Sequence, residues 1–471
     1  MMRDMGDPLS KEKEHLSQSF NLEEQAIAQP LPARLSIGQK MERALYFIFL
    51  AFFLMMTAHS LRSDPLGIGI SSHHKVLTLE QRVDNILQKT PLIDGHDDLP
   101  ILIRFKYGNQ IYQDDFTTKF VHGGFPGHVD LPRLSKGKVG GTFWSVFVEC
   151  PKDWQNFSDA NYALSVRQTI EQVDLWLRLQ QAYPDTFSAP PNGTTALQPF
   201  LDGKIISPMG MEGLHSIGNS LAHLRHFYAQ GVSYATLTHN CHNRYADAAV
   251  TELPDGSVKK ADPLWHGVSE AGKALVSEMN RLGMIVDLSH VSAETMRDVL
   301  GAGKDDWTGS SAPVIFSHSS AYAVCPHPRN VPDDVLQLVK SRNSLVMVNI
   351  APDFVSCKAS DNPSGLPDFV PENATLEHVA DHIMHIGQLI GFDHVGFGSD
   401  FDGIGSVPRG LDDVSKFPDL VAELLRRGVS DEDAGKVVGG NLLRVWRDVD
   451  RIALDKQANG ALPLEDDLPE A

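Results

Sequence analysis

Short apolar runs alternate with amphipathic helical patterns along most of the chain. Eight runs have the composition of strands buried on both faces: Pro91–Gly95, Gly141–Glu149, Ile205–Glu212, Tyr234–His239, Met284–His290, Pro313–His318, Leu345–Ile350 and His394–Asp400. Helical periodicity fills most of the intervals, as at Ala160–Gln181, Ser220–Gln230, Gly267–Leu282 and Val331–Ser341. Buried strands separated by helices predict an all-parallel sheet, and eight of them close a (β/α)₈ barrel. An open doubly wound sheet would need a glycine-rich phosphate turn after its first strand, and the DGHDD run there is not one.

The first 85 residues do not follow this pattern. Residues 1–43 are polar without periodicity, which predicts a disordered cytoplasmic tail. Residues 44–61 (ALYFIFLAFFLMMTAHSL) carry no acidic or basic side chain except His59, and basic residues precede them. This segment is therefore predicted to be an uncleaved signal anchor, with the membrane as its partner. The positive-inside rule places the preceding tail in the cytoplasm, which predicts a single-pass type II protein with its catalytic part outside. Cleavage after this segment would instead give a secreted protein, and a buried core helix is the least favoured interpretation. The other expected parts are a linker at 62–85, a barrel at 86–450 and an acidic tail at 451–471.

Composition narrows the function classes. The formal net charge is -19, which argues against nucleic acid as a partner because its phosphates would be repelled. The four cysteines form no CxxC pair, so a cysteine-type zinc site is not expected. Three N-x-S/T glycosylation sequons, at Asn156, Asn192 and Asn373, accompany the hydrophobic segment. Together these features favour an oxidising compartment and two disulfides.

Histidines and acidic residues stand where the predicted strands end, and a barrel keeps its active site at the carboxyl ends of its strands. His96 and Asp98 follow the first run, Glu212 ends the third, and His290 and His318 end the fifth and sixth. A glutamate can bridge two metals about 3.5–4 Å apart, one on each oxygen. We therefore expect two metal sites that share Glu212, one with His96 and Asp98, the other with His290 and His318. Imidazole and carboxylate ligands suit zinc, and ligand type leaves manganese, cobalt and iron open.

Three further residues could complete a hydrolytic site in which two metals lower the pKa of a bound water to supply hydroxide. His239 ends the fourth run and is placed to hydrogen-bond a developing oxyanion. Asp400 ends the eighth run and could move a proton or hold a substrate amino group. Arg329 follows the sixth run and could pair with a substrate carboxylate, although a surface position is equally compatible with its sequence context.

Some assignments stay open on the pattern alone. Glu149 also ends a strand and competes with Glu212 as the bridging carboxylate, and Asp402 competes in the same way with Asp400. Three histidines within residues 378–385 share one helical face, but they lie away from the catalytic rim, so a solvated or partly buried helix face is the favoured interpretation.

Seven motifs, in order along the chain, resemble the renal, or membrane, dipeptidase family of metal-dependent amidohydrolase-like barrels. They are DGHDD at 94–98, MEGLHSIG at 211–218, LTHNCHNRYAD at 237–247, VDLSHVS at 286–292, VIFSHSSAY at 314–322, RNVPDD at 329–334 and GFGSDFDG at 396–403. The likeness runs from about Thr90 to about Asp448. It implies a binuclear zinc site with the five ligands above and favours Glu212 over Glu149.

The resemblance also implies roles outside the metal site. His239, Arg329 and Asp400 match family residues that contact substrate, and the substrates are dipeptides with free amino and carboxyl ends. It implies the disulfides Cys150–Cys241 and Cys325–Cys357, and a homodimer that needs no intermolecular disulfide. A related amidohydrolase acting on a specialised amide or peptide-derived metabolite is the alternative, and a non-catalytic recognition module is less favoured because every ligand position is filled.

The chain departs from the family at a few places. Asp97 stands where many members carry Asn, and Ser399 where Gly is common, so both could tune specificity from behind the ligands. The CPHPRN segment at 325–330 differs just before Arg329. Animal members are held by a C-terminal lipid anchor, whereas this chain has an N-terminal hydrophobic segment, so the mode of attachment does not carry over.

Overall fold

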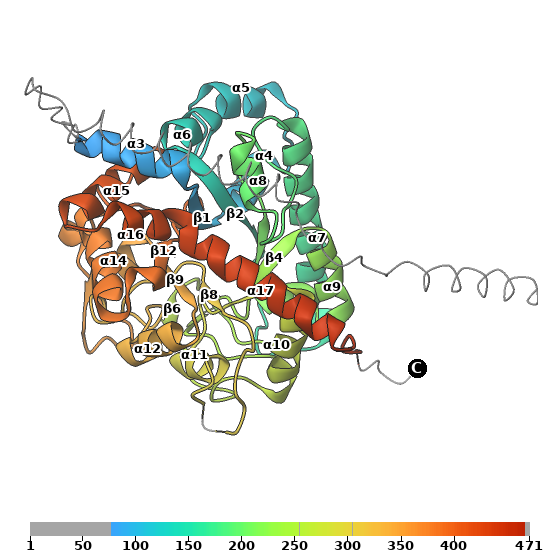
Figure 1. The fold of residues 1–471 in the computed structure, drawn as a ribbon. Coiled ribbons are helices and arrows are strands. Elements are labelled where there is room, and N and C mark those ends of the chain that lie inside the picture. Colours follow the sequence, from blue (N-terminus) through green and yellow to red (C-terminus); the bar gives the residue numbers. More distant parts are fainter. Residues whose placement is uncertain (1–76, 254, 304, 467–471) are drawn as a thin grey trace, which may run out of the picture. The chain divides into compact units, whose positions relative to one another are not determined.

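Eight parallel strands close into a barrel in the computed structural model, which describes residues 77–253, 255–303 and 305–466 (Figure 1). Around the barrel the strands follow the order β1-β12-β9-β8-β7-β4-β3-β2. They are β1 (Leu92–Asp97), β2 (Val139–Phe147), β3 (Met209–Glu212), β4 (Val232–Thr236), β7 (Ile285–Asp287), β8 (Ile315–Phe316), β9 (Leu345–Val348) and β12 (Val395–Phe397). Each lies within or overlaps one of the eight predicted runs, so the (β/α)₈ prediction is confirmed.

Helices surround the barrel and connect its strands (Figure 1). The main ones are α3 (Leu79–Lys89), α4 (Leu99–Tyr107), α5 (Asp114–His122), α6 (Leu131–Lys136), α7 (Asp159–Ala182), α9 (Leu221–Ala229), α10 (Glu270–Leu282), α11 (Ala293–Val299), α12 (Asp333–Ser341), α14 (Leu376–Ile390), α15 (Phe417–Arg426), α16 (Asp431–Gly435) and α17 (Asn441–Ala458). Two short antiparallel hairpins are added, β5 (Val250–Glu252) with β6 (Val258–Lys260), and β10 (Cys357–Lys358) with β11 (Asp368–Phe369).

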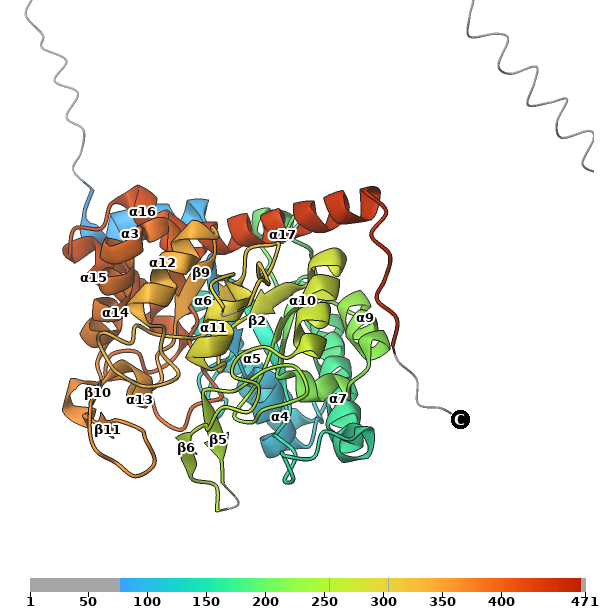
Figure 2. The ribbon, with the colours of Figure 1, turned by 90° about the horizontal axis from the view of Figure 1, so that it is seen from below.

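The core has two layers because the strands are buried on both faces. One layer lies between the barrel and its helices. The other fills the barrel, where Ile93, Phe143, Ile285 and Leu345 cluster with side chains of α17. The Trp446 ring of α17 lies 4.9 Å from that of Phe143, centroid to centroid. α17 therefore closes one end of the barrel, and Figure 2 shows both hairpins projecting from the opposite end, where the candidate site lies.

The domain is longer at both ends than the predicted 86–450. α3 begins at Leu79, inside the expected linker, because Val83, Ile86 and Leu87 form a buried face and Thr78 makes a reciprocal capping box. α17 continues to Ala458 in place of the expected acidic tail. The segment after α17 is also tied down, since the Asp466 carboxylate accepts hydrogen bonds from the first backbone amides of α9.

The predictions for residues 1–61, including the anchor at 44–61, lie outside the described residues. Within residues 77–253, 255–303 and 305–466, no helix has both the length and the apolar character needed to cross a membrane. The three sequon asparagines, Asn156, Asn192 and Asn373, are all exposed. Cellular location, glycosylation and dimerisation stay predictions.

Glu278 on α10 joins two arginines to the C-terminal segment, and its removal should destabilise the fold. Its carboxylate, with 1% of the side chain exposed, accepts hydrogen bonds from Arg225, Arg281 and the backbone amide of Leu464. We expect Glu278→Ala to lower the free energy of unfolding by about 2–3 kcal/mol at pH 7, less than for a fully buried pair because both arginines reach solvent. Urea unfolding followed by tryptophan fluorescence measures the change.

The pH dependence of the difference in unfolding free energy between wild type and Glu278→Ala tests whether the ion pairs of Glu278 cause it. Burial raises the pKa of Glu278, but its hydrogen bonds outweigh burial and hold it below the ordinary value of 4.5. The stabilisation is therefore complete above that value and is lost as the pH falls through the lowered pKa, so wild type and variant should converge in acid. Glu270→Ala, on the exposed side of the same helix, is the control and should change little. A Glu278 effect that persisted unchanged in acid would contradict the ion-pair explanation.

Candidate functional site

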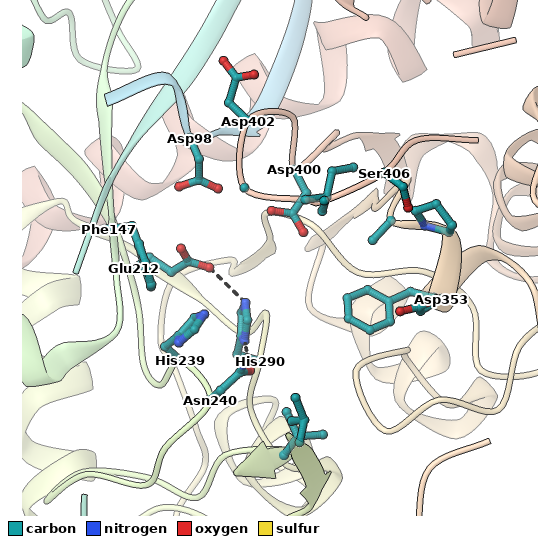
Figure 3. Close-up of a pocket in the computed structure, with 18 of the residues that line it drawn as sticks. Asp98, Phe147, Glu212, His239, Asn240, His290, Asp353, Asp400, Asp402 and Ser406 are labelled. Carbon is teal, nitrogen blue, oxygen red and sulfur yellow. Dashed lines mark hydrogen bonds and ion pairs between the residues drawn. The ribbon is translucent and has the colours of Figure 1, made fainter. Parts of the chain in front are cut away.

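The site lies at the carboxyl ends of the strands in a pocket of about 400 Å³ (Figure 3). Strand register places these ends at one level, since Glu212 at the end of β3 is aligned with Phe147 of β2 and with Thr236 of β4. His96 and Asp98 come from the end of β1, and His290 and His318 lie just beyond β7 and β8. The structure brings together all five predicted ligand residues from these separate strands.

The carboxylate of Glu212 faces a different group with each oxygen. Oε2 lies 3.5 Å from Nε2 of His96, and that nitrogen is 3.2 Å from Oδ2 of Asp98. Oε1 lies 2.9 Å from Nε2 of His290 and 3.4 Å from Nε2 of His318. In both groups the ligand atoms lie within 4.8 Å of one another, and all five side chains are buried. Two three-residue clusters therefore share one carboxylate.

The arrangement has the marks of a place for cations. His290 and His318 bring their Nε2 atoms within 2.9 Å, although two neutral imidazoles with lone pairs aimed at one point repel each other. Oδ1 of Asp98 is buried and has no hydrogen-bond partner in the described part of the chain. A divalent ion in each cluster would satisfy these atoms, so the donor set fits two metals.

The Nδ1 atom of each of the three ligand histidines lies within hydrogen-bond distance of an oxygen atom outside the two clusters. Nδ1 of His96 is 2.6 Å from the Tyr234 hydroxyl, and Nδ1 of His290 is 2.9 Å from Oδ1 of Asn240. Nδ1 of His318 is 2.8 Å from Oγ of Ser317, which itself donates to Asp287. An Nδ1–H that donates to oxygen leaves the lone pair of Nε2 directed into the site.

Three residues at the site have a positive φ angle, which is uncommon for residues other than glycine. His290 and Asp400 have φ of 67°, and Asp402 has φ of 64°, backbone angles that residues other than glycine seldom adopt. Each conformation costs of order 1 kcal/mol and persists only where surrounding contacts enforce it. Ser399 supplies one such contact at β12, since its backbone amide and hydroxyl both donate to the Asp94 carboxylate. This departure from the family thus braces β1 against β12 behind the ligands.

His239 lies beside the ligand group. Its ring centroid is 4.5 Å from that of His290 and 4.7 Å from that of Phe147, and it lines the pocket. Burial lowers its pKa well below the ordinary value, and the neighbouring His215 and Arg329 lower it further. His239 is therefore neutral and can donate one hydrogen bond into the pocket.

Both disulfides border this region. Cys150 pairs with Cys241 and Cys325 with Cys357, the pairing that the resemblance implied. Sγ of Cys150 lies 3.8 Å from Nδ1 of His239, so the first disulfide holds the end of β2 and the loop of His239 together.

Arg329 is a buried cation without a partner. Its side chain is 1% exposed, and none of its three guanidinium nitrogens has a hydrogen-bond partner in the described part of the protein. It lies over the Phe354 ring at 5.3 Å. Burial lowers its pKa to about 10 against the opposing pull of Asp400 and Glu212, so it stays charged at neutral pH. An unpaired buried charge costs several kcal/mol, which makes an anionic ligand the natural partner. A surface position for Arg329 is excluded.

Asp400 lines the pocket, and Figure 3 shows it between Asp98 and Asp353. Its Oδ2 accepts a 2.9 Å hydrogen bond from Asn349. Burial raises its pKa to about 8, with His96 opposing and Asp98 and Glu212 adding to the rise. Bound dications would lower that pKa again, because they are the largest nearby charges.

The alternatives that were open in the sequence are decided by geometry. Glu149 is exposed and lies beyond the end of β2, away from the clusters, whereas Glu212 lies between them. Asp402 reaches the pocket, but its carboxylate accepts a hydrogen bond from the His128 backbone amide and lies 3.1 Å from that imidazole. On α14, His382 is buried and bonds to backbone atoms of other segments, whereas His378 and His385 are partly exposed beside Asp381 and Asp333.

Sequence reasoning missed the supporting residues. Asn240, Tyr234 and Ser317 hold the ligand histidines but carry no periodic signal of their own. Asn240 and Ser317 each adjoin a singled-out histidine in the chain, which is the one clue the sequence offers.

The barrel, the clustered candidate ligands and the buried cation are together typical of a metal-dependent hydrolase. A family model described as membrane dipeptidase (Peptidase family M19) matches residues 80–460. The chain belongs to this family, whose members depend on metal, and it is a metallo-dipeptidase, a hydrolase.

Relatives and solved structures agree with this assignment. The chain is 46% identical over 389 residues to dipeptidase aclJ of Aspergillus oryzae, covering 82% of this chain and 84% of that protein. It is 45% identical over 378 residues to dipeptidase tcpJ of Claviceps purpurea, covering 80% and 81%. A crystal structure of a metallopeptidase from Rhodobacter sphaeroides, liganded with a phosphinate mimic of the dipeptide L-Ala-D-Ala, is similar with a TM-score of 0.62. It is 25% identical and covers 76% of this chain and 99% of that one.

Proposed function

We propose that the protein is a binuclear zinc dipeptidase that cleaves dipeptides with free amino and carboxyl ends. The observation that carries the two-metal proposal is the carboxylate of Glu212, which faces His96 and Asp98 with one oxygen and His290 and His318 with the other. His96, Asp98 and Glu212 would hold one ion, and Glu212, His290 and His318 the other. Imidazole and carboxylate donors without thiolate suit zinc. The ions would supply an activated water and polarise the scissile carbonyl.

Arg329 supports the requirement for a free carboxylate. A buried, unpaired guanidinium beside the pocket offers two parallel N–H donors to a carboxylate, which gives both charge compensation and orientation. The bound carboxylate would satisfy a cation that the described residues leave unpaired. The liganded relative is complexed with a dipeptide mimic, which is consistent with a substrate of this size.

His239 and Asp400 divide the remaining tasks. The neutral imidazole of His239 adjoins the ligands and would donate a hydrogen bond to the oxygen that gains charge as the carbonyl is attacked. Asp400 lies within reach of both ligand groups, where its carboxyl can take a proton from the attacking water and deliver it to the leaving nitrogen. Asp400 would also face the amino group of the bound substrate, while Arg329 pairs with the carboxylate at the other end of the substrate.

The test uses the purified full chain, with metal content measured on the same sample. Hydrolysis of Gly-D-Ala and Gly-L-Ala is compared with that of their N-acetylated and C-amidated forms. We expect about two zinc ions per chain and cleavage only of the free-ended dipeptides, since either block removes a charge that the site pairs. Two zinc ions without cleavage of any dipeptide would favour a specialised amide as substrate. Failure of a folded sample to retain metal would refute the proposal.

A further inference from the structure

The pocket has a polar floor and apolar walls. The floor contains the clustered ligands, whereas Ile101 and Phe105 of α4 and Ile404 are apolar lining residues that follow the paired strands β1 and β12. The Phe105 side chain is 64% exposed although it lies next to the buried Ile101 on the same helix. A large ring left open to water at the mouth of a site is available to cover a ligand. We call Ile101, Phe105 and Ile404 the α4 wall.

The α4 wall adjoins the Asp98 and Asp400 side of the site. α4 begins directly after Asp98, and Ile404 follows Asp400 by four residues. Gly403 lies against the carboxylates of Asp98 and Asp400, where there is no room for a side chain. A Cβ at this position would overlap the Asp98 carboxylate and lie 2.9 Å from Oδ1 of Asp400. The absence of that atom lets the loop of Ile404 approach the floor.

Arg329 comes from a different part of the barrel than the α4 wall, since it follows β8, which is three strands around from β1. It stacks over Phe354, which follows β9, and Figure 3 shows Asp400 between Asp98 and the neighbouring Asp353. A dipeptide whose carboxylate pairs with Arg329 therefore extends its amino-terminal residue toward Asp400 and the α4 wall. This placement rests on the proposed function.

We propose that the α4 wall binds the side chain of the amino-terminal residue of the substrate and selects large apolar side chains there. The pocket volume of about 400 Å³ is in the range of sites that hold small ligands, roughly 300–1,000 Å³, and leaves room for a side chain beside the dipeptide backbone. No lysine or arginine is among the described residues that line the pocket, whereas Asp353, Asp400 and Asp402, which are not assigned as metal ligands, are. An acidic side chain at this position would be repelled, and an apolar one would gain contact area.

The experiment compares kcat/KM of the zinc-loaded full chain on X-L-Ala dipeptides with X as Gly, Leu, Phe or Glu. Burying a large apolar side chain corresponds to about a tenfold gain or more, so we expect Phe-Ala and Leu-Ala to exceed Gly-Ala by that factor and Glu-Ala to fall below it. Phe105→Ser should lower the ratio of Phe-Ala to Gly-Ala by about fivefold, and Ile404→Ser should lower the same ratio.

Tyr112→Ser is the matched control, because Tyr112 is 62% exposed, lies in the segment after α4 and does not line the pocket. It should leave the ratio unchanged. The Gly-X series reports on the carboxyl-terminal residue, and its preferences should survive Phe105→Ser. Equal rates for all X-Ala dipeptides, or equal ratios in both wall variants and wild type, would overturn the proposal while Gly-Ala cleavage still supported a dipeptidase. Absence of cleavage of every free-ended dipeptide would instead overturn the proposed function.

Discussion

Replacing Glu212 with alanine should remove both metals and lower kcat/KM by on the order of a thousandfold or more, about 4 kcal/mol or more in transition-state stabilisation. Each cluster has three members, and Glu212 is the member that both contain. Its loss leaves two ligands for each ion and brings three imidazoles together without their common anion. Metal analysis of the purified variant together with dipeptide kinetics measures the effect.

Two comparison variants separate metal loss from other causes. Glu149→Ala removes an exposed carboxylate near the end of the neighbouring strand and should retain both metal and activity. His239→Ala should retain metal but lose about 10²–10³-fold in kcat, since it removes a donor to the developing oxyanion. A Glu212→Ala protein that kept two metals would refute the bridging assignment, and loss of metal from His239→Ala would refute the role given to His239.

Arg329→Met should lower kcat/KM for a free-ended dipeptide by about 10²–10³-fold, yet leave the protein as stable or more stable. Removing one partner of a buried charge pair costs about 2–5 kcal/mol in binding. The free protein pays for an unpaired buried guanidinium, so an apolar side chain of similar length should be neutral or stabilising by about 1–3 kcal/mol. Kinetics and urea unfolding of metal-loaded samples measure both effects.

A substrate comparison makes the Arg329 result specific. A C-amidated dipeptide has no carboxylate to pair with Arg329, so any residual cleavage of it should change little in the variant. Arg167→Met, on the exposed surface of α7, is the control and should leave both activities unchanged. An equal loss on free and amidated substrates would show that Arg329 acts on the catalytic step or on the fold, and would contradict carboxylate binding.

Some assignments needed only local sequence. The eight strands could be predicted because a parallel strand that is buried on both faces has a continuous run of apolar residues in the sequence. His96, Glu212 and His290 could then be singled out because each ends or directly follows such a run, where barrel topology brings side chains together. Neither step requires knowing which residues touch.

Other assignments failed or stayed open because they depend on contacts between distant segments. Glu149 and Glu212 both end strand-like runs, so the strand pattern cannot separate them; the family resemblance favours Glu212, and register and burial in the structure agree. The first half of α3 falls within the predicted linker at 62–85, because α3 is a short helix whose buried face is defined only by the segments that pack against it. The segment ending at Asp466 is acidic and looks like a tail, but its carboxylate caps a helix more than two hundred residues away in the chain.

The sequence by itself predicted the barrel and the candidate ligands, because periodicity and strand-end chemistry are local properties repeated along the chain, and its seven motifs indicated the family. Tertiary structure alone decided that Arg329 is buried without a hydrogen-bond partner among the described residues, and that Phe105 and Ile404 line the same pocket. These facts concern the distance between residues far apart in sequence and the water excluded around them. Such properties arise only when the strands close and their loops meet.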